Sequence, residues 1–398
     1  MFKIRKGSKN LVFFVVLFVA LPPFAIDTYI PAFGNIANSF NVPVSSIAIT
    51  ISTYLVGFGL GMFFWGALSD RYGRKKILII GMLVYIASTI LCSQTDSFNT
   101  LIFMRFIQGL GDSPAAVAAM AILKDCYRGQ KLIKTVATMI MVFMIAPIVA
   151  PIVGSVIIYT TGKWQNIFHF LTFYGIVLLF ITFMMPETLK PHKRPESLVK
   201  SFAVYIKHLL NGPFMLGTIT GALVFGAMFS FISASSTLII EYYHLGYTQF
   251  CAIFALNILG LVFASNLIRK KLTPHNRIRF ISLGYALAIV VVFINVILSY
   301  TIDNIYVFVV FNTFATAGFA LTNITISSKT IDILKEGFGA GNAIMRLFKF
   351  IVAGFAGFSL SFISISHLMI GIPIQQLIFV LLSAGLFLII KDKLFLSN

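Results

Sequence analysis

The chain has 398 residues, of which 59% are hydrophobic and only 11% are charged, with a mean hydropathy of +0.96. A soluble domain carries about 25% charged residues, so this composition excludes a soluble protein and indicates an integral membrane protein. The net charge of +18 does not indicate a nucleic-acid-binding protein, because all but four of the 30 Lys and Arg residues fall in the terminal tails and in alternate loops. Positive charge in this arrangement marks cytoplasmic loops.

Twelve apolar runs are long enough to cross a bilayer, which takes about 20 residues. They predict an all-α membrane protein with transmembrane helices at 11–34, 46–68, 77–94, 99–123, 134–160, 164–186, 212–240, 246–269, 277–300, 303–328, 338–365 and 370–390. The first run follows a basic N-terminus as a signal peptide does, but it is too long and shows no convincing cleavage site. We interpret it as an uncleaved first span, with both termini in the cytoplasm.

The longest hydrophilic stretch lies between the sixth and seventh runs and divides the chain into two halves of six spans. Two such halves with a substrate bound between them near the bilayer midplane are a known transporter plan. The expected segments are a cytoplasmic N-terminal tail at 1–10, a six-helix half at 11–186, a cytoplasmic linker at 187–211, a second six-helix half at 212–390 and a cytoplasmic C-terminal tail at 391–398. Sequence repetition between the halves is weak.

A carboxylate, Asp27, lies in the outer half of the first span. A charged side chain at bilayer depth costs about 2.5–3.5 kcal/mol on insertion scales, and protonation removes that charge. A carboxyl group that binds and releases a proton in this place is the physical basis of proton coupling. The alternative is a structural ion pair.

The loop between spans two and three has the order Gly-Ala-Leu-Ser-Asp-Arg-Tyr-Gly-Arg-Lys-Lys from Gly66 to Lys76. Its glycines allow two helix ends to approach closely. Asp70 and Arg74 are four residues apart, the spacing at which side chains meet on one helical turn. A plain positively charged anchor is the alternative, but an anchor does not need this fixed order.

Span four carries Arg105 about six residues from its outer end, roughly 9 Å deep at 1.5 Å per residue. That depth is near the one expected for Asp27, so we expect the two to pair, directly or through Gln108. Asp112 lies about two turns deeper on the same helix face. It is either a cavity residue or a group that makes a hydrogen bond in helix packing.

Spans five and eleven hold the remaining unusual residues. In span five, Pro147, Pro151 and Gly154 suit a bent helix packed closely on a neighbour, although packing alone is the alternative. In span eleven, Arg346 and Lys349 lie roughly 12–17 Å from the helix start. Because facing lipid is costly for a charge, we expect at least one of them to face a cavity and to favour an anionic or zwitterionic substrate.

Several of these stretches resemble one family. The loop from Gly66 to Lys76 resembles the signature loop of the major facilitator superfamily. The twelve-span drug/proton antiporters of that family have similar motifs in the first, fourth and fifth spans, here Asp27-Thr28-Tyr29-Ile30-Pro31-Ala32, Arg105-Phe106-Ile107-Gln108-Gly109 and Pro147 to Gly154. More narrowly, the Bcr/CflA branch is similar at Ile232-Ser233-Ala234-Ser235 with Glu241, Phe254-Ala255-Leu256-Asn257 and Lys124-Asp125-Cys126-Tyr127.

The sequence also departs from the family pattern. Asp112 stands where the family usually has a small residue, and Met120 stands where an arginine is common. Ala146 and Ala150 replace glycines of the wider fifth-span motif, and the two cations of span eleven look unusual.

The resemblance implies the major facilitator fold and a proton-coupled antiporter that exports small amphipathic compounds, of the chloramphenicol and bicyclomycin type, across the bacterial inner membrane by alternating access. The alternative is a dedicated exporter of a siderophore or another anionic metabolite. A membrane enzyme is the rival of a different class, but the sequence shows no cluster of His, Cys and carboxylate residues or activated nucleophile. The expected partners are the substrate, protons and membrane lipids, with no cofactor, metal or nucleic acid and a monomeric state.

The resemblance, together with the depth and spacing of the polar residues, gives each candidate residue an expected role. Asp27 takes up a proton outside and releases it inside, and Arg105 tunes that exchange. The remaining candidates fall into three groups: a substrate cavity of Tyr29, Gln108, Asp112, Arg346 and Lys349; a cytoplasmic gate motif of Gly66, Asp70, Arg71, Gly73 and Arg74; and a helix bend of Pro147, Pro151 and Gly154.

Overall fold

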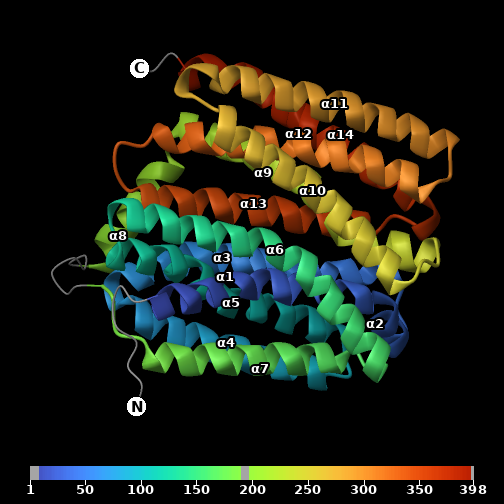
Figure 1. Cartoon of the computed structure of the whole chain (residues 1–398), viewed down its shortest axis with the longest axis horizontal. Helices are drawn as coiled ribbons and strands as arrows, with labels where there is room; N and C mark the ends of the chain where they lie inside the picture. Colours follow the sequence, from blue (N-terminus) through green and yellow to red (C-terminus); the bar gives the residue numbers. More distant parts are fainter. Residues whose placement is uncertain (1–8, 190–196, 396–398) are drawn as a thin grey trace. The chain divides into compact units, whose positions relative to one another are not determined.

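The computed structural model describes residues 9–189 and 197–395, and the regular elements in these ranges are all helical (Figure 1). Twelve helical segments of the described chain are long and apolar enough to cross a membrane: Asn10–Phe40, Val44–Tyr72, Arg74–Gln94, Phe98–Cys126, Gly129–Thr161, Gln165–Met184, Gly212–Tyr242, Tyr247–Lys271, Arg277–Thr301, Ile305–Asp332, Phe338–Leu360 and Ile365–Lys391. They confirm the predicted fold class. The outer parts of both expected tails and residues 190–196 of the expected linker lie outside the described residues.

The chain divides into two compact units, each held together mainly by contacts within itself. The first consists of Met1–Asn35 and Thr53–Tyr205, and the second of Ile36–Ser52 and Ile206–Asn398. In both units the spans are helices because a bilayer offers no hydrogen-bond partner to a backbone group, so each segment must satisfy its own N–H and C=O groups.

In the first unit, the first span packs against the fourth, fifth and sixth spans. These are α1 (Lys9–Asp27) against α5 (Phe98–Cys126), α6 (Gly129–Thr161) and α7 (Gln165–Met184). The third span, α4 (Arg74–Gln94), packs against α5 and α7.

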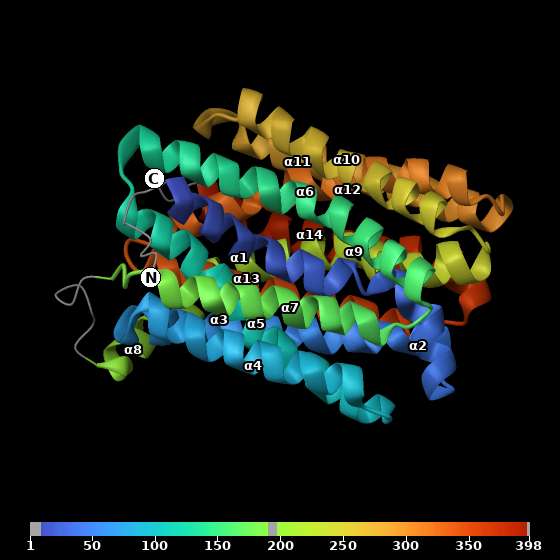
Figure 2. The same cartoon turned by 60° about the horizontal axis from the view of Figure 1, so that its bottom comes forward.

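The second unit repeats this packing pattern. Its first span, α9 (Gly212–Ser236), packs against its fourth, fifth and sixth, which are α12 (Ile305–Asp332), α13 (Phe338–Leu360) and α14 (Leu368–Phe395). Its third span, α11 (Arg277–Thr301), packs against α12 and α14, and it lies along α12 in both views (Figures 1 and 2). The two units therefore share one arrangement of helices, although their sequences show little repetition.

Two local features differ from the expected pattern. The first span continues beyond the predicted end at residue 34: α1 ends at Asp27, a short 3-10 turn covers Ile30–Ala32, and α2 runs from Phe33 to Phe40. Proline suits such a restart, because its fixed φ fits the first turn of a helix and it has no N–H to satisfy. The second feature is α8 (Leu198–Leu209), which forms within the segment predicted only as a hydrophilic linker.

Candidate functional site

The signature loop of the first unit is a tight break between two helices. α3 (Ala48–Tyr72) ends one residue before Gly73, and α4 begins one residue after it. Gly73 has a φ of 105°, a backbone conformation that residues with a Cβ atom rarely adopt. Arg74 Nη1 lies 2.5 Å from Asp70 Oδ1, so the predicted pair forms. It forms across the break, however, and not along a continuous helical turn.

Arg74 also connects α4 to the neighbouring helices of its unit. Its Nη1 donates to Ser69 Oγ at 3.0 Å, and its Nε donates to Asp125 Oδ2 at 3.4 Å, at the end of α5. The same Asp125 oxygen accepts a hydrogen bond from the Thr188 hydroxyl at 3.2 Å. The gate motif is therefore part of a polar cluster to which α3, α4, α5 and the segment after α7 all contribute.

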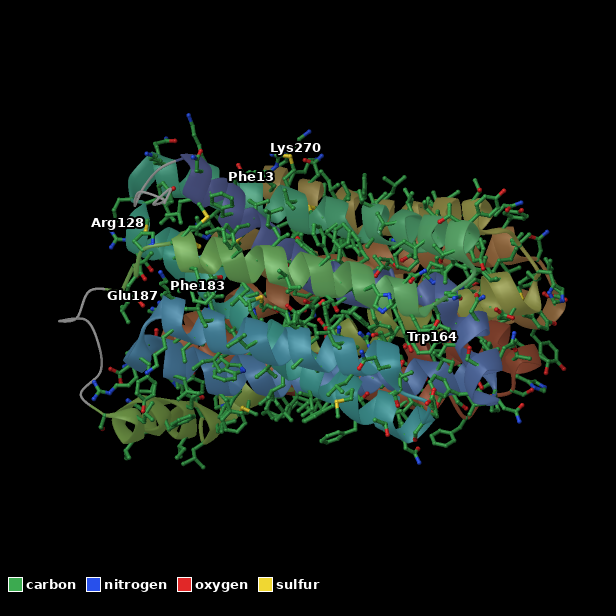
Figure 3. All side chains as sticks on the ribbon, turned by 90° about the horizontal axis from the view of Figure 1, so that it is seen from below. Phe13, Arg128, Trp164, Phe183, Glu187 and Lys270 are labelled. Carbon is green, nitrogen blue, oxygen red and sulfur yellow. The ribbon has the colours of Figure 1, made fainter. Side chains whose placement is uncertain are left out.

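A carboxylate that sequence reasoning missed completes this cluster. Glu187 follows α7, and it accepts the first backbone N–H groups of α4, from Arg74 at 3.1 Å and from Lys75 at 3.2 Å. In return, Lys75 Nζ donates to the carbonyl O of Phe183 at 2.7 Å. Figure 3 shows Glu187 and Phe183 at one end of α7, with Trp164 at its other end. The only sequence signal was an acidic residue within one turn of the end of a span.

The remaining residues of the gate motif lie on α3. The Tyr205 hydroxyl of α8 lies over Gly66, because a Cβ at Gly66 would be 2.8 Å from that oxygen. Burial raises the pKa of Tyr205, and the negative charge of Asp70 raises it further. Arg71 lies half-buried in the last turn of α3. The structure thus places Tyr205, which sequence reasoning assigned to a linker, beside the gate motif.

Asp27 is the last residue of α1 and is 5% exposed. Among the residues that the structure describes, its carboxylate forms no hydrogen bond or ion pair. The next residue, Thr28, turns its hydroxyl back to the carbonyl O of Phe24 at 2.5 Å. The chain therefore leaves the helical path directly after a buried carboxylate without a partner.

The fifth span lies against this break. A Cβ at Gly154 would overlap the carbonyl O of Thr28, so only glycine permits this approach of α6 to the end of α1. α6 runs unbroken from Gly129 to Thr161 with Pro147 and Pro151 inside it. Pro151 is buried on the same face as Gly154, whereas Pro147 is half-buried.

Arg105 is fully buried in the first unit. Its Nη1 donates to the carbonyl O of Ala25 in α1 at 3.2 Å and to Gln108 Oε1 at 2.6 Å. Its guanidinium carbon lies 4.7 Å from the ring centre of Tyr29, 4.6 Å from that of Tyr54 and 5.9 Å from that of Phe168. Stacking on aromatic faces stabilises a cation that has few hydrogen-bond partners.

The expected pairing of Arg105 with Asp27 is wrong for this structure. Arg105 reaches α1 at Ala25 and bonds there to the backbone, while Gln108 donates to the Thr89 hydroxyl of α4 at 2.8 Å and does not link the two charges. The physical reason is the aromatic cage: the guanidinium lies among the rings of Tyr29, Tyr54 and Phe168 and donates to the carbonyl O of Ala25, and not to the Asp27 carboxylate.

Asp112 is also enclosed within the first unit. It is fully buried, its Oδ2 accepts a hydrogen bond from the Tyr54 hydroxyl, and Oδ1 has no partner among the described residues. Tyr29 and Gln108 are fully buried as well. Tyr29 and Gln108 contact Arg105, Asp112 bonds to Tyr54, whose ring lies beside Arg105, and none of these three predicted cavity residues reaches an open surface in this structure.

The two cations of the eleventh span belong to the second unit. Lys349 lies midway between Phe338 and Leu360, about 16 Å from each end of α13. Its Nζ donates to Asn323 Oδ1 and Ser327 Oγ of α12, each at 2.8 Å, and lies 5.8 Å from the ring centre of Phe225 in α9. Lys349 is half-buried and Arg346, one turn earlier, is exposed. A cation at such depth costs about 2.5–3.5 kcal/mol, which two neutral acceptors offset only in part.

Comparison with known proteins places the chain in a family. The family model described as Major Facilitator Superfamily matches residues 12–358. The chain is 31% identical over 255 residues to a bicyclomycin resistance protein homolog of Haemophilus influenzae, a match that covers 64% of each chain. It is 27% identical over 282 residues to the multidrug resistance protein MdtL of Klebsiella pneumoniae, covering 68% of this chain and 71% of that protein. The first of these matches thus spans slightly less than two thirds of the relative.

Solved structures agree on the fold. A D-xylose-proton symporter superposes with a TM-score of 0.73 at 16% identity, covering 96% of this chain and 98% of that one. A bacterial homolog of the human lysosomal transporter Spinster, in an inward-facing and occupied conformation, gives a TM-score of 0.74 at 12% identity over 98% of both chains. At these identities the likeness concerns the fold alone. This chain is a multi-pass membrane protein that belongs to the Major Facilitator Superfamily.

Proposed function

We propose that this protein is a proton-coupled antiporter that exports small amphipathic compounds across the bacterial inner membrane by alternating access, with both termini in the cytoplasm. Its relatives named for bicyclomycin and multidrug resistance support this substrate class. They give no support to the alternative of a siderophore exporter. The fold belongs to a transporter family, and the proposal includes no enzymatic activity.

The observation that carries the proposal is the state of Asp27. It is a buried carboxylate at the C-terminal end of α1. The carbonyl groups at that end carry partial negative charge, which disfavours the ionised form of a carboxylate there. Asp27 has no bonded partner among the described residues, so a proton can bind or leave without breaking an ion pair. Arg105 holds α1 two residues earlier, through Ala25, and Gly154 of α6 contacts the next residue. Proton exchange at Asp27 would therefore act on the junction of three helices.

The gate motif has a second part in this proposal. Asp70, Arg71 and Arg74 would hold the cytoplasmic ends of spans together in one transport state and release them in another. The polar cluster at Arg74 supports this role, because it links four segments of one unit through a few side chains.

Inverted membrane vesicles with an imposed pH gradient test the proposal. Addition of chloramphenicol should dissipate the gradient with the wild type and not with Asp27→Asn. Asp96→Asn is the matched control, because Asp96 is an exposed carboxylate in the loop between α4 and α5. If Asp27→Asn retained full proton-driven transport, the assignment of coupling to this residue would be refuted.

A further inference from the structure

Lys349 occupies a charged site that the proposed coupling mechanism does not use. It connects the first, fourth and fifth spans of the second unit, α9, α12 and α13, through its contacts with Phe225, Asn323 and Ser327. In the first unit, Asp27, Arg105 and Gly154 lie on the first, fourth and fifth spans. In each unit, this group of residues thus lies on the same three helices of the shared packing pattern.

The oxygen atoms around Lys349 are held in place. The side-chain amide of Asn323 donates through Nδ2 to the carbonyl O of Gly221 in α9 at 2.6 Å. That bond fixes the amide so that Oδ1 faces Lys349 Nζ. An ammonium group has three donors, and Asn323 and Ser327 take two of them. Among the described residues the third donor has no acceptor, and it is left for a ligand.

Among the described residues of its unit, no carboxylate forms an ion pair with Lys349. α9 and α13 contain no Asp or Glu, and the one acidic residue of α12 is Asp332, its last, which pairs with Arg277. Arg346, one turn away on α13, adds a second positive charge at i,i+3 spacing. A membrane-embedded cation without a counterion marks a ligand or ion pathway.

The surroundings also limit what the anion can be. Lys349 lies at mid-helix, about 16 Å from either end, so a lipid headgroup at the membrane surface does not reach it. Beside it lies an aromatic group in which Phe225 contacts Phe229 at 4.9 Å and Phe350 at 5.6 Å between ring centres. A cation beside a cluster of tilted and edge-to-face rings suits a ligand that has both a negative charge and an aromatic body.

We infer that Lys349, held by Asn323 and Ser327 beside the Phe225 rings, is a subsite for the carboxylate of an amphipathic aromatic compound. This inference rests on the proposed function, because it names the substrate class of the same transporter. Lys349 contributes the charge-assisted hydrogen bond, Arg346 adds positive potential, and the phenyl rings contact the apolar body of the ligand. Neutral compounds of the same shape bind to the rings alone.

The test compares nalidixic acid, an aromatic carboxylic acid, with its uncharged methyl ester. Equilibrium binding is measured by calorimetry on the purified, full-length protein in detergent at pH 7.5. The wild type should bind the acid about tenfold or more tightly than the ester, since a hydrogen bond to a charged partner has this effect on affinity. Lys349→Met should abolish the preference by weakening acid binding alone. Lys349→Arg should retain part of it, and Phe225→Leu should weaken both compounds.

Two controls make the outcome decisive. Lys335→Met removes an exposed lysine from the loop between α12 and α13 and should change nothing. If Lys349→Met does not fold, Lys349→Gln takes its place, because its uncharged amide keeps a hydrogen-bond donor on this side chain. Equal affinity of the wild type for acid and ester would overturn the inference, as would a preference that survives loss of Lys349. Binding needs no pH gradient. A failure of antiport in vesicles would therefore refute the proposed function, and the comparison of acid and ester binding could still be interpreted.

Discussion

The capping of α4 by Glu187 gives the sharpest quantitative prediction for stability. The first backbone N–H groups of a helix have no partner within it, and Gly73, the residue before α4, has no side chain to supply one. Glu187 accepts from the N–H groups of Arg74 and Lys75 instead, more than a hundred residues further along the chain. It also places a negative charge at the positive end of the helix.

Replacement of Glu187 by Ala removes both effects. Loss of an N-cap costs about 0.5–2 kcal/mol, and loss of a favourable charge at a helix N-terminus costs about 0.3–1 kcal/mol. We therefore expect the free energy of unfolding to fall by about 1–3 kcal/mol. Glu187→Gln should cause a smaller loss, because its amide oxygen still accepts one hydrogen bond while the charge is gone.

The assay is unfolding by SDS titration from mixed micelles, with loss of helicity followed by circular dichroism. Glu336→Gln is the control for loss of a carboxylate that does not cap a helix, because Glu336 is 66% exposed and bonds only to the exposed Lys207 among the described residues. Equal stability of Glu187→Ala and the wild type would refute the capping argument. Equal losses in Glu187→Ala and Glu187→Gln would show that the negative charge, and not hydrogen bonding, stabilises α4.

Two further predictions concern the buried network and the surface ion pair. Tyr54→Phe removes the hydroxyl that donates to Asp112 but keeps the ring against Arg105. We therefore expect the free energy of unfolding to fall by about 1–3 kcal/mol in the same SDS titration. A variant as stable as the wild type would show that Asp112 needs no donor. The hydrogen bond from Lys207 lowers the pKa of Glu336 below its ordinary 4.5, so its stabilising effect should be present above pH 4.5 and disappear as the pH falls through the lower folded value. Melting curves of the wild type and Glu336→Gln should therefore differ slightly above that range and coincide below it, whereas a difference that grows on acidification would contradict this sign.

Local sequence was sufficient for the helices and for the short-range contacts. Twelve apolar runs predicted twelve spans, because a bilayer forces each long apolar segment to become a helix. The spacing of Asp70 and Arg74 predicted their ion pair, because four residues bring two side chains together near a helix end. The unusual depth of Lys349 was also readable, since position along a span gives depth directly.

Contacts between distant segments were decided only by the tertiary structure. Similar depth along two spans predicted that Arg105 would meet Asp27, but depth does not fix the rotation of a helix about its axis. In the structure the guanidinium of Arg105 lies among three aromatic rings and donates to the carbonyl O of Ala25. Glu187 and Tyr205 appeared to belong to a polar connection and instead cap α4 and cover Gly66.

The shared packing of the two units was likewise invisible in the sequence. Helix packing depends on the shape of side chains at a few contacts and tolerates almost any apolar residue elsewhere, so the two halves could diverge in sequence while keeping one arrangement. The sequence by itself therefore determined the number of membrane-spanning helices and the depth of residues along them, because these follow from hydropathy along one segment. Only the tertiary structure determined which polar side chains meet, because that depends on how each helix is rotated and which neighbours it packs against.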